Sequence, residues 1–209
     1  MTLHGYFRST AAWRVRIALG LKGIAYDRAF HHLRRGEQRA ADYLAVNPQG
    51  FVPALVTDDG AVLTQSLAIV EFLDETHRAP PLLPPDPLGR ARARAFALAI
   101  ACDIHPLQNL TVLERLRGLG LDEAAVQDWA RAAIDRGLTA CEALIGDGVG
   151  PFAFGAAPGL ADLCLVPQLY NARRFGVDLR WPRLAAVEAA CAELPAFIVA
   201  RPENQPDAE

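Results

Sequence analysis

The sequence predicts an α/β domain followed by an all-helical domain. Over the first 76 residues, short apolar runs alternate with helical patterns, as expected for a mixed sheet covered by helices. Five prolines then fall within residues 77–87, which is the composition of a linker. Beyond them, apolar residues recur at helical spacings of three and four, typical of helices that bury one face. We therefore expect domains at residues 1–78 and 88–209, joined by a linker at 79–87.

The composition narrows the possible partners. The chain has 209 residues, 52% of them hydrophobic, and a formal net charge of −3. This charge argues against nucleic acid as a partner, because nucleic acid favours a basic patch. No uninterrupted apolar run approaches the roughly 18 residues of a membrane helix, and no secretory signal is visible. We therefore expect a cytoplasmic protein without a membrane partner.

The sequence offers no obvious metal or redox site. The cysteines are widely spaced, form no CxxC pair and lie in apolar helical contexts, so we interpret all four as core residues and expect no metal. They are Cys102, Cys141, Cys164 and Cys191. His31 and His32 are neighbours on an expected strand and point to opposite faces. Lys22 is the only lysine beside twenty arginines, so the abundance of arginine identifies no site.

The first domain is built from short elements with clear turn signals. We expect strands at residues 2–6, 25–31, 51–56 and 61–64, and helices at 12–22, 39–46 and from residue 65 onward. Gly23 ends the first helix, Asp59-Gly60 marks a hairpin, and Ser66 is the expected N-cap of the last helix. This β-α-β-α-β-β-α order is that of a thioredoxin-like domain.

Pro53 stands near the start of the third expected strand. A proline there can be cis, which would leave the backbone of Val52 free to pair with an extended peptide. A trans proline that only begins the strand is the commoner case, and the sequence alone favours it.

The second domain is expected to be a bundle of helices at residues 91–116, 123–145, 160–174 and 185–193. Pro106 lacks a backbone N–H and should kink the first of these helices. Asp162, three residues after Gly159, is interpreted as a helix-capping residue without a catalytic role. The tail after Arg201 has the composition of a disordered segment.

The turn before the first helix is the strongest candidate for chemistry. Ser9 and Thr10 stand where the first strand gives way to that helix. The first N–H groups of a helix have no partner within it, and the helix dipole adds positive charge, so an anion such as a thiolate is stabilised there. A hydroxyl residue at this position is most often only an N-cap, so the turn by itself identifies no activity.

Several segments along nearly the whole chain resemble the zeta class of the cytosolic glutathione transferases. They are RSTAAWRVRIALGLKGI at 8–24, NPQGFVPAL at 47–55, LTQSLAI at 63–69, CDIHPL at 102–107, ADLCLVPQ at 161–168 and NARRF at 171–175. The resemblance implies a thioredoxin-like domain followed by a helical bundle, and a homodimer. The best-known zeta members are maleylacetoacetate isomerases. It therefore also implies a glutathione-dependent isomerase that converts maleylacetoacetate to fumarylacetoacetate in tyrosine and phenylalanine breakdown.

The resemblance implies glutathione as the cofactor. Its γ-glutamyl carboxylate would bind at Gln65 and Ser66, where the N-terminus of a helix suits an anion. The other implied positions are the backbone of Val52 before a cis Pro53 for the cysteinyl part, Gln38 for the glycyl end, Ser9 and Thr10 for the sulfur, and His105 and Asn109 from the second domain. For His105, a packed structural role is an equal alternative.

The turn that would hold the sulfur departs from the family pattern. Many zeta members carry Ser-Ser-Cys after the arginine, whereas this chain has Ser9-Thr10-Ala11. Glutathione itself must therefore supply the sulfur, and the pKa of a free thiol, near 8.5, must fall by roughly one to two units to give mostly thiolate at pH 7. We expect Ser9 to donate to the sulfur, with Thr10 and the neighbouring N–H groups as secondary donors.

The substrate implied by the resemblance is a small dicarboxylate. A thiolate that adds to its cis double bond leaves a single bond that can rotate, and elimination then returns the trans alkene. The enolate and the carboxylates need positive charge nearby, and the resemblance points to Arg8 and Arg174. A maleylpyruvate isomerase would use the same residues. A general glutathione transferase or a non-catalytic glutathione-binding module is a further alternative.

Overall fold

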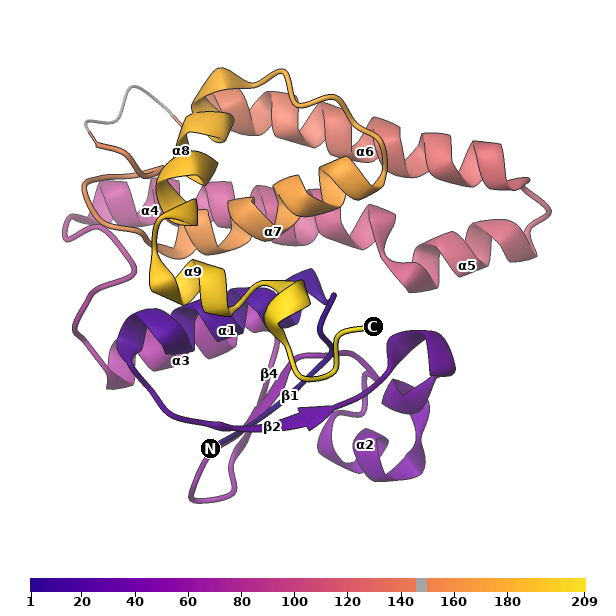
Figure 1. The fold of residues 1–209 in the computed structure, drawn as a ribbon, viewed down its shortest axis with the longest axis horizontal. Coiled ribbons are helices and arrows are strands. Elements are labelled where there is room, and N and C mark those ends of the chain that lie inside the picture. The colour runs from indigo at the N-terminus through magenta and orange to yellow at the C-terminus, as the bar shows by residue number, and fades with distance from the viewer. Residues whose placement is uncertain (146–149) are drawn as a thin grey trace. The chain divides into compact units, whose positions relative to one another are not determined.

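The computed structural model describes residues 1–145 and 150–209 (Figure 1). They form two compact units, one of residues 1–81 together with 192–209, and the other of residues 82–191. The expected division assigned every residue from 88 onward to the helical domain. Residues 192–209 instead fold into the unit that holds the sheet.

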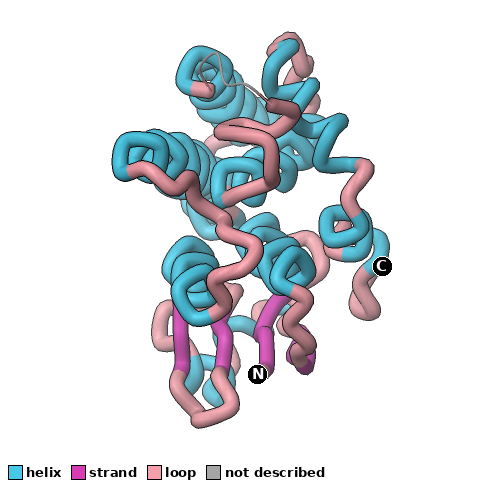
Figure 2. Tube along the Cα trace, turned by 90° about the vertical axis from the view of Figure 1, so that its left-hand side faces the viewer, coloured by secondary structure: helices cyan, strands magenta, loops and turns pink. Residues whose placement is uncertain are grey.

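The first unit is a four-stranded mixed sheet with helices. Its elements are β1 (Thr2–Gly5), α1 (Thr10–Lys22), β2 (Asp27–Phe30), η1 (Leu33–Arg35), η2 (Glu37–Arg39), α2 (Ala41–Val46), β3 (Ala54–Val56), β4 (Val62–Thr64), α3 (Ser66–Thr76), α9 (Pro195–Val199) and η5 (Pro202–Asn204). The strand order is β2-β1-β3-β4, with β1 parallel to β2 and antiparallel to β3. Helices α1 and α3 lie side by side over one face of the sheet (Figure 2). The predicted order of elements and the thioredoxin-like fold are confirmed.

Helix α1 is the centre of this unit. Every residue from Ala12 to Leu19 is buried, Arg14 and Arg16 included. Strand β1 approaches through Gly5, where an added Cβ would lie 3.3 Å from the Cβ of Ala12. Helix α9 approaches through Gly20, where an added Cβ would lie 3.1 Å from the Cβ of Ala196. The last helix therefore completes the core around the first helix, which explains why residues 192–209 belong to this unit.

The only lysine joins the end of α1 to the end of α3. The Lys22 side chain is 0% exposed, and its Nζ donates hydrogen bonds of 2.6 Å each to Asp74 Oδ1 and to the carbonyl oxygens of His77 and Pro80. An ammonium group has three donors, and each of them has an acceptor here. Full hydrogen bonding offsets the cost of burying the charge.

Two peptide bonds before proline are cis among the described residues, Val52-Pro53 and Ala79-Pro80. The sequence alone favours a trans Pro53, so that expectation is wrong. The cis form agrees with what the family resemblance implies for this position.

The second unit is helical. Its elements are α4 (Pro87–Leu98), the π-helical turn η3 (Ala99–Ile104), the 3₁₀ turn η4 (His105–Gln108), α5 (Leu110–Gly118), α6 (Glu123–Leu144), α7 (Leu160–Arg174) and α8 (Pro182–Ala192). The helix expected at residues 91–116 is interrupted at Pro106 as predicted, by a π turn before the proline and a 3₁₀ turn around it. Missing backbone donors are a common cause of such interruptions. The helix predicted at 160–174 coincides with α7.

One helical stretch in the described part of the chain, Pro87–Gly118, is long and apolar enough to span a membrane by length and composition alone. Its segments pack against α6 and α7 within the second unit, and a core helix satisfies the same criterion. The stretch contains charged residues such as Arg90, Arg92 and Arg94 and is therefore not an uninterrupted apolar run.

The cysteines follow the prediction at three of four positions. Cys141, Cys164 and Cys191 are buried, whereas Cys102 is exposed, and all four are free thiols. Burial raises the pKa of Cys141 to about 12, as expected for an unreactive core thiol. The prediction is wrong for Cys102 because it lies in η3, where each π turn adds a residue and rotates the following side chains around the helix.

Asp162 caps α7 as predicted. Its Oδ2 accepts a hydrogen bond of 2.8 Å from the N–H of Gly159, and its Oδ1 accepts one of 2.9 Å from the N–H of Ala153. The side chain is almost completely enclosed, and burial raises its pKa to about 6 despite these two bonds. Its contacts are those of a structural residue that joins the preceding loop to the helix.

The tail after Arg201 is folded, so the expectation of disorder is wrong. The Nε2 of Gln205 donates to the carbonyl oxygens of Val199 (2.8 Å) and Arg201 (2.9 Å). Asp207 accepts a hydrogen bond from the backbone of Phe7 at the other end of the chain. The polar side chains that suggested disorder form hydrogen bonds with backbone groups, one of them 200 positions away.

Candidate active site

Ser9 stands at the end of the turn between β1 and α1. It is the N-cap of α1, and its Oγ accepts a hydrogen bond of 3.2 Å from the N–H of Ala12. A hydroxyl group has one hydrogen and two lone pairs, so this bond leaves the Ser9 hydrogen free for another acceptor. Helix capping and donation to a sulfur are therefore compatible at this residue.

Thr10, the first residue of α1, is more enclosed than Ser9. It is buried, and its Oγ1 forms no hydrogen bond within the described residues, whereas Ser9 is partly exposed. A partly exposed hydroxyl can reach an arriving sulfur without rearrangement. The geometry therefore favours Ser9 as the main donor.

Arg8 holds a positive charge one residue before Ser9. Its Nη2 donates to the hydroxyl of Tyr6 at 3.3 Å, and its guanidinium lies 5.0 Å from the centre of the Phe7 ring, within the range of a cation–π contact. A guanidinium has five N–H donors. One bond to Tyr6 leaves donors available for a carboxylate.

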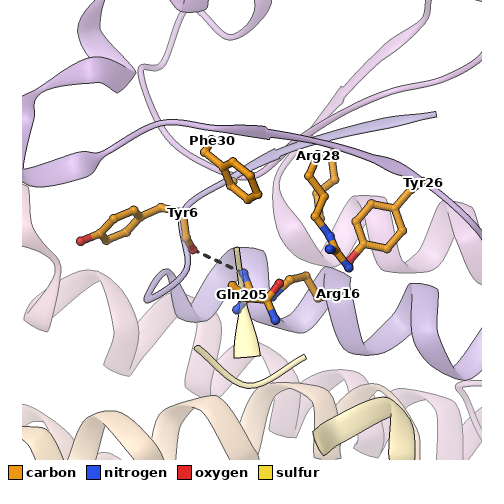
Figure 3. A pocket seen from close by; sticks show the side chains of 8 residues that line it. Tyr6, Arg16, Tyr26, Arg28, Phe30 and Gln205 are labelled. Atoms are coloured by element: carbon orange, nitrogen blue, oxygen red, sulfur yellow. Dashed lines mark hydrogen bonds between the residues drawn. The ribbon is translucent and has the colours of Figure 1, made fainter. Parts of the chain in front are cut away.

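Arg16 of α1 holds the same turn through hydrogen bonds to its backbone. Its Nη1 and Nη2 donate to the carbonyl oxygens of Tyr6 (3.4 Å) and Phe7 (2.9 Å), and its Nε donates to that of Ala200 (3.1 Å). Figure 3 shows the bond to Tyr6 and Gln205 beside the guanidinium. Burial lowers the pKa of Arg16 to about 10. Arg16 was not among the predicted site residues, although an arginine inside an otherwise apolar helix is a usable signal in the sequence.

A small pocket opens next to Arg16 (Figure 3). It is lined by Leu3, Gly5, Tyr6, Arg16, Tyr26, Arg28, Phe30 and Gln205. Its cavity volume is about 10 Å³, which is the space of about one water molecule. This pocket is too small for a tripeptide, and we assign no ligand to it.

Helix α3 begins at Ser66 with Gln65 as its N-cap, so the prediction of Ser66 as N-cap is wrong by one residue. The reason is that the carbonyl oxygen of Gln65 already accepts the first helical bond, 3.0 Å from the N–H of Ile69. Gln65 has a φ of 67°, the one positive φ at a non-glycine residue in the described chain. Such a conformation costs about 1–3 kcal/mol and is found most often at binding and catalytic sites.

Ser66 combines a buried hydroxyl with the start of a helix. Its Oγ accepts a hydrogen bond of 3.2 Å from Nη1 of Arg14, which comes from α1. The N–H groups of the first turn of α3 have no partner within the helix. They create an anion-binding environment at Gln65 and Ser66, as the prediction for a carboxylate requires.

In the loop before β3, the backbone of Val52 has no hydrogen-bond partner among the described residues. The preceding carbonyl oxygen, that of Phe51, accepts hydrogen bonds from the hydroxyl of Tyr43 (2.6 Å) and from Nδ2 of Asn47 (2.7 Å). These bonds hold the loop in place. The backbone N–H and C=O of Val52 form no hydrogen bond with any described residue, so both remain available to an extended peptide.

Gln38 lies in η2, and its side chain is buried. Its Oε1 has no hydrogen-bond partner among residues 1–145 and 150–209. Buried amide oxygens are nearly always bonded, so a donor from a ligand would complete this one.

The remaining predicted residues belong to the second unit. His105 opens η4, and Asn109 is the N-cap of α5, with its Oδ1 accepting a hydrogen bond of 2.7 Å from the N–H of Leu110. Arg174, at the end of α7, donates from Nη1 to Oδ1 of Asn171 at 2.8 Å. These contacts lie within the helical unit, and the roles of His105, Asn109 and Arg174 toward a ligand stay predictions. In the described parts of the chain, no three His, Cys, Asp or Glu side chains gather where they could hold a metal ion.

Comparison with protein families decides the identity of the two units. Residues 8–76 match the family model of the glutathione S-transferase N-terminal domain, and residues 91–190 match that of the glutathione S-transferase C-terminal domain. The chain belongs to the glutathione S-transferase family.

Three relatives of this glutathione S-transferase show its place in the family. The maleylacetoacetate isomerase of Pseudomonas aeruginosa is 52% identical over 99% of this chain and 98% of its own length. The holo structure of a maleyl pyruvate isomerase, a bacterial zeta-class glutathione S-transferase, is 46% identical with a TM-score of 0.97 and covers 100% of both chains. The maleylacetoacetate isomerase of Anaeromyxobacter dehalogenans, with glutathione bound in its active site, is 48% identical with a TM-score of 0.91 over 100% of this chain and 97% of its own. The predicted resemblance to the zeta class is confirmed.

Proposed function

We propose that this glutathione S-transferase is a glutathione-dependent isomerase that converts maleylacetoacetate to fumarylacetoacetate. The observation that carries the proposal is the free hydrogen of the Ser9 hydroxyl at the N-terminus of α1, beside the cation of Arg8. The two maleylacetoacetate isomerases that are 52% and 48% identical support the choice of substrate.

Groups within the first unit fit the chemistry of glutathione. The free backbone of Val52 suits the amide groups of a peptide, and the unpartnered Oε1 of Gln38 suits an N–H donor. The N-terminus of α3 at Gln65 and Ser66 suits a carboxylate. Each of these groups lacks a full set of partners among the residues that the structure describes and would gain one from the tripeptide.

Bound glutathione supplies a thiolate that adds reversibly to the cis double bond, which can rotate while it is single. Ser9 donates a hydrogen bond to the sulfur and, with the N-terminus of α1, lowers the pKa of the thiol by stabilising its ionised form. Arg8 supplies positive charge for a substrate carboxylate and for the carbonyl oxygen that gains negative charge. No proton is gained or lost over the cycle, so no separate general base is required.

The remaining parts of the proposal rest on the resemblance. Arg174 would hold a substrate carboxylate, and His105 and Asn109 would contact glutathione. The protein would act as a cytoplasmic homodimer in tyrosine and phenylalanine breakdown.

A maleylpyruvate isomerase is the second candidate. The solved structure of a maleyl pyruvate isomerase, with a TM-score of 0.97 to this chain, supports this candidate. The two substrates share the cis double bond between a carbonyl and a carboxylate, so the same residues would serve both. A transferase or a non-catalytic glutathione-binding module would bind glutathione without turning over either compound.

The deciding experiment measures cis-to-trans isomerisation of maleylacetoacetate and of maleylpyruvate by ultraviolet absorbance. Each is assayed with glutathione, without it, and with S-methylglutathione, which keeps the tripeptide but has no thiol. We expect turnover only with free glutathione and faster turnover of maleylacetoacetate. Faster turnover of maleylpyruvate selects the second candidate. Tight glutathione binding without turnover of either compound contradicts both isomerase assignments.

A further inference from the structure

Arg14 is a buried cation whose donors are only partly used. It lies in α1, its side chain is 2% exposed, and its Nη1 donates to Oγ of Ser66 at 3.2 Å. Its Nε and Nη2 have no hydrogen-bond partner in the described chain, and no described carboxylate forms an ion pair with it.

Burying an arginine in this way is costly. A guanidinium stays protonated in proteins, and a buried charge without a counter-charge loses its hydration with little in return. Native proteins therefore give such a group either an anion or a full set of hydrogen-bond acceptors. Since the described residues supply neither to Nε and Nη2 of Arg14, the missing partner is expected from a ligand, and an anion suits the charge.

The same α1 helix provides a comparison in Arg16. Arg16 is also buried, but its Nε, Nη1 and Nη2 all bond to backbone carbonyl oxygens. Its role is complete within the protein. Arg14, two residues earlier, has only the Ser66 hydroxyl as an acceptor among residues 1–145 and 150–209, so burial within this helix does not by itself explain the spare donors.

The contact with Ser66 also orients that hydroxyl. Because Arg14 donates to Oγ, the hydroxyl hydrogen of Ser66 must point away from Arg14 toward another acceptor. Ser66 is the first residue of α3, where the unpaired N–H groups of the first turn attract an anion. The hydroxyl and the helix N-terminus can therefore donate to one carboxylate.

We propose that Arg14 is a positioning residue for the carboxylate site at the start of α3. It orients the Ser66 hydroxyl and supplies the counter-charge that makes the site selective for an anion. This inference rests on the proposed function, in which the anion is the γ-glutamyl carboxylate of glutathione.

The test combines a protein change with a ligand change. Wild type, Arg14→Met and Arg14→Lys are titrated calorimetrically with glutathione and with γ-aminobutyryl-cysteinyl-glycine, which lacks only the γ-glutamyl carboxylate. We expect Arg14→Met to lose about 10- to 100-fold in affinity for glutathione, the range for a hydrogen bond to a charged group. Its affinity for the analogue should change far less. Arg14→Lys keeps the charge and should recover much of the preference for glutathione.

Arg16→Met is the matched control, because it removes an equally buried cation from the same helix. It should lower the affinities for both ligands by the same factor, without changing their ratio. If Arg14→Met also weakens both ligands equally, or weakens neither, Arg14 has only a structural role and the inference is overturned.

Ser66→Ala keeps the test decisive if Arg14→Met does not fold. It removes the hydroxyl that Arg14 orients, so it should reduce the preference for glutathione over the analogue. When Arg14→Lys is added to Ser66→Ala, the preference for glutathione should fall little further. Additive, ligand-independent losses in these two variants would overturn the inference. If the wild-type protein binds neither ligand, the glutathione assignment itself is overturned. Equal losses of affinity for both ligands in the variants would overturn only the role of Arg14 and leave that assignment intact.

Discussion

The carboxylate of Asp207 accepts a hydrogen bond of 2.9 Å from the backbone N–H of Phe7, although 200 positions separate the two residues. Arg16 bonds to the carbonyl oxygen of the same Phe7 at 2.9 Å. Phe7 is thus held on both sides of its backbone, two residues before Ser9. The C-terminal tail is therefore part of the support for the turn that presents Ser9.

Asp207→Ala should weaken both the fold and the activity. It leaves a largely enclosed N–H without its acceptor, which costs about 1–3 kcal/mol. The free energy of unfolding measured in urea should fall by that amount, and kcat should fall because the Ser9 turn is less rigid. Glu203→Ala, an exposed change in the same tail, is the control and should alter neither quantity. An Asp207→Ala protein with unchanged stability and kcat would show that the tail does not support the turn.

Ser9→Ala should reduce turnover far more than glutathione affinity. The variant loses the hydrogen bond to the sulfur, for which we expect a fall in kcat of about 10²-fold. It also loses the N-cap bond to Ala12, worth about 1 kcal/mol of stability. Steady-state kinetics and calorimetric titration with glutathione separate the two effects.

The control for Ser9 is its neighbour. Thr10→Val removes a buried hydroxyl that has no partner among the described residues, so it should leave kcat within a few-fold of wild type. Wild-type turnover in Ser9→Ala would instead assign the donor role to Thr10 or to the backbone N–H groups.

Local signals were sufficient to predict most of the secondary structure. Gly23 ends α1 with a φ of 64°, and Asp59-Gly60 joins β3 to β4. Both depend on the backbone preferences of a few adjacent residues. The same is true of Pro106, whose missing N–H interrupts the helix wherever the rest of the chain lies.

The errors arise where distant segments decide the outcome. The order of the tail depends on Phe7, which is far away in sequence, and the exposure of Cys102 depends on a π turn that no composition predicts. The candidate site shows the same division. Ser9 could be predicted from its position before a helix, and Ser66 was placed within one residue of a helix start. The acceptors of Arg14 and Arg16 became visible only in the structure.

Lys22 should be inaccessible to amine reagents in the folded protein. Its side chain is 0% exposed and its Nζ makes three hydrogen bonds of 2.6 Å. Mass spectrometry after brief treatment with an acetylating ester should find Lys22 unmodified in the native protein and modified after unfolding in urea. Rapid modification of the native protein at Lys22 would contradict the buried geometry.

Lys22→Met should be strongly destabilising. It removes one partner of Asp74 and the donor to two backbone carbonyl oxygens, and breaking a buried pair on one side costs about 3–5 kcal/mol. Urea unfolding measures the loss. Arg78→Met, at an exposed position near the end of α3, is a suitable control, and a loss no greater than that of the control would contradict the structural role of Lys22.

His4 and His31 should make the stability of the first unit depend on pH. Nδ1 of His4 and Nε2 of His31 lie 2.9 Å apart, so one ring donates to the other. Burial lowers the pKa of both rings below 6.5, and the charge of His4 lowers that of His31 further, while Asp42 and Glu37 raise it. The folded state therefore holds fewer protons than the unfolded state. The stability contributed by the pair is fully present above pH 6.5 and is lost as pH falls through the lowered pKa values.

Urea unfolding at pH 7.5, 6.5 and 5.5 measures this dependence. The free energy of unfolding of the wild type should decrease as pH falls over this range, because protonation of both rings abolishes the hydrogen bond between them. His31→Asn removes one titrating ring and the bond, so it should lower stability at pH 7.5 and flatten the slope below pH 6.5. His77→Asn, which changes an exposed histidine, should keep the wild-type slope. If His31→Asn retains the full slope, the pH dependence originates in the carboxyl groups of the protein and not in this pair.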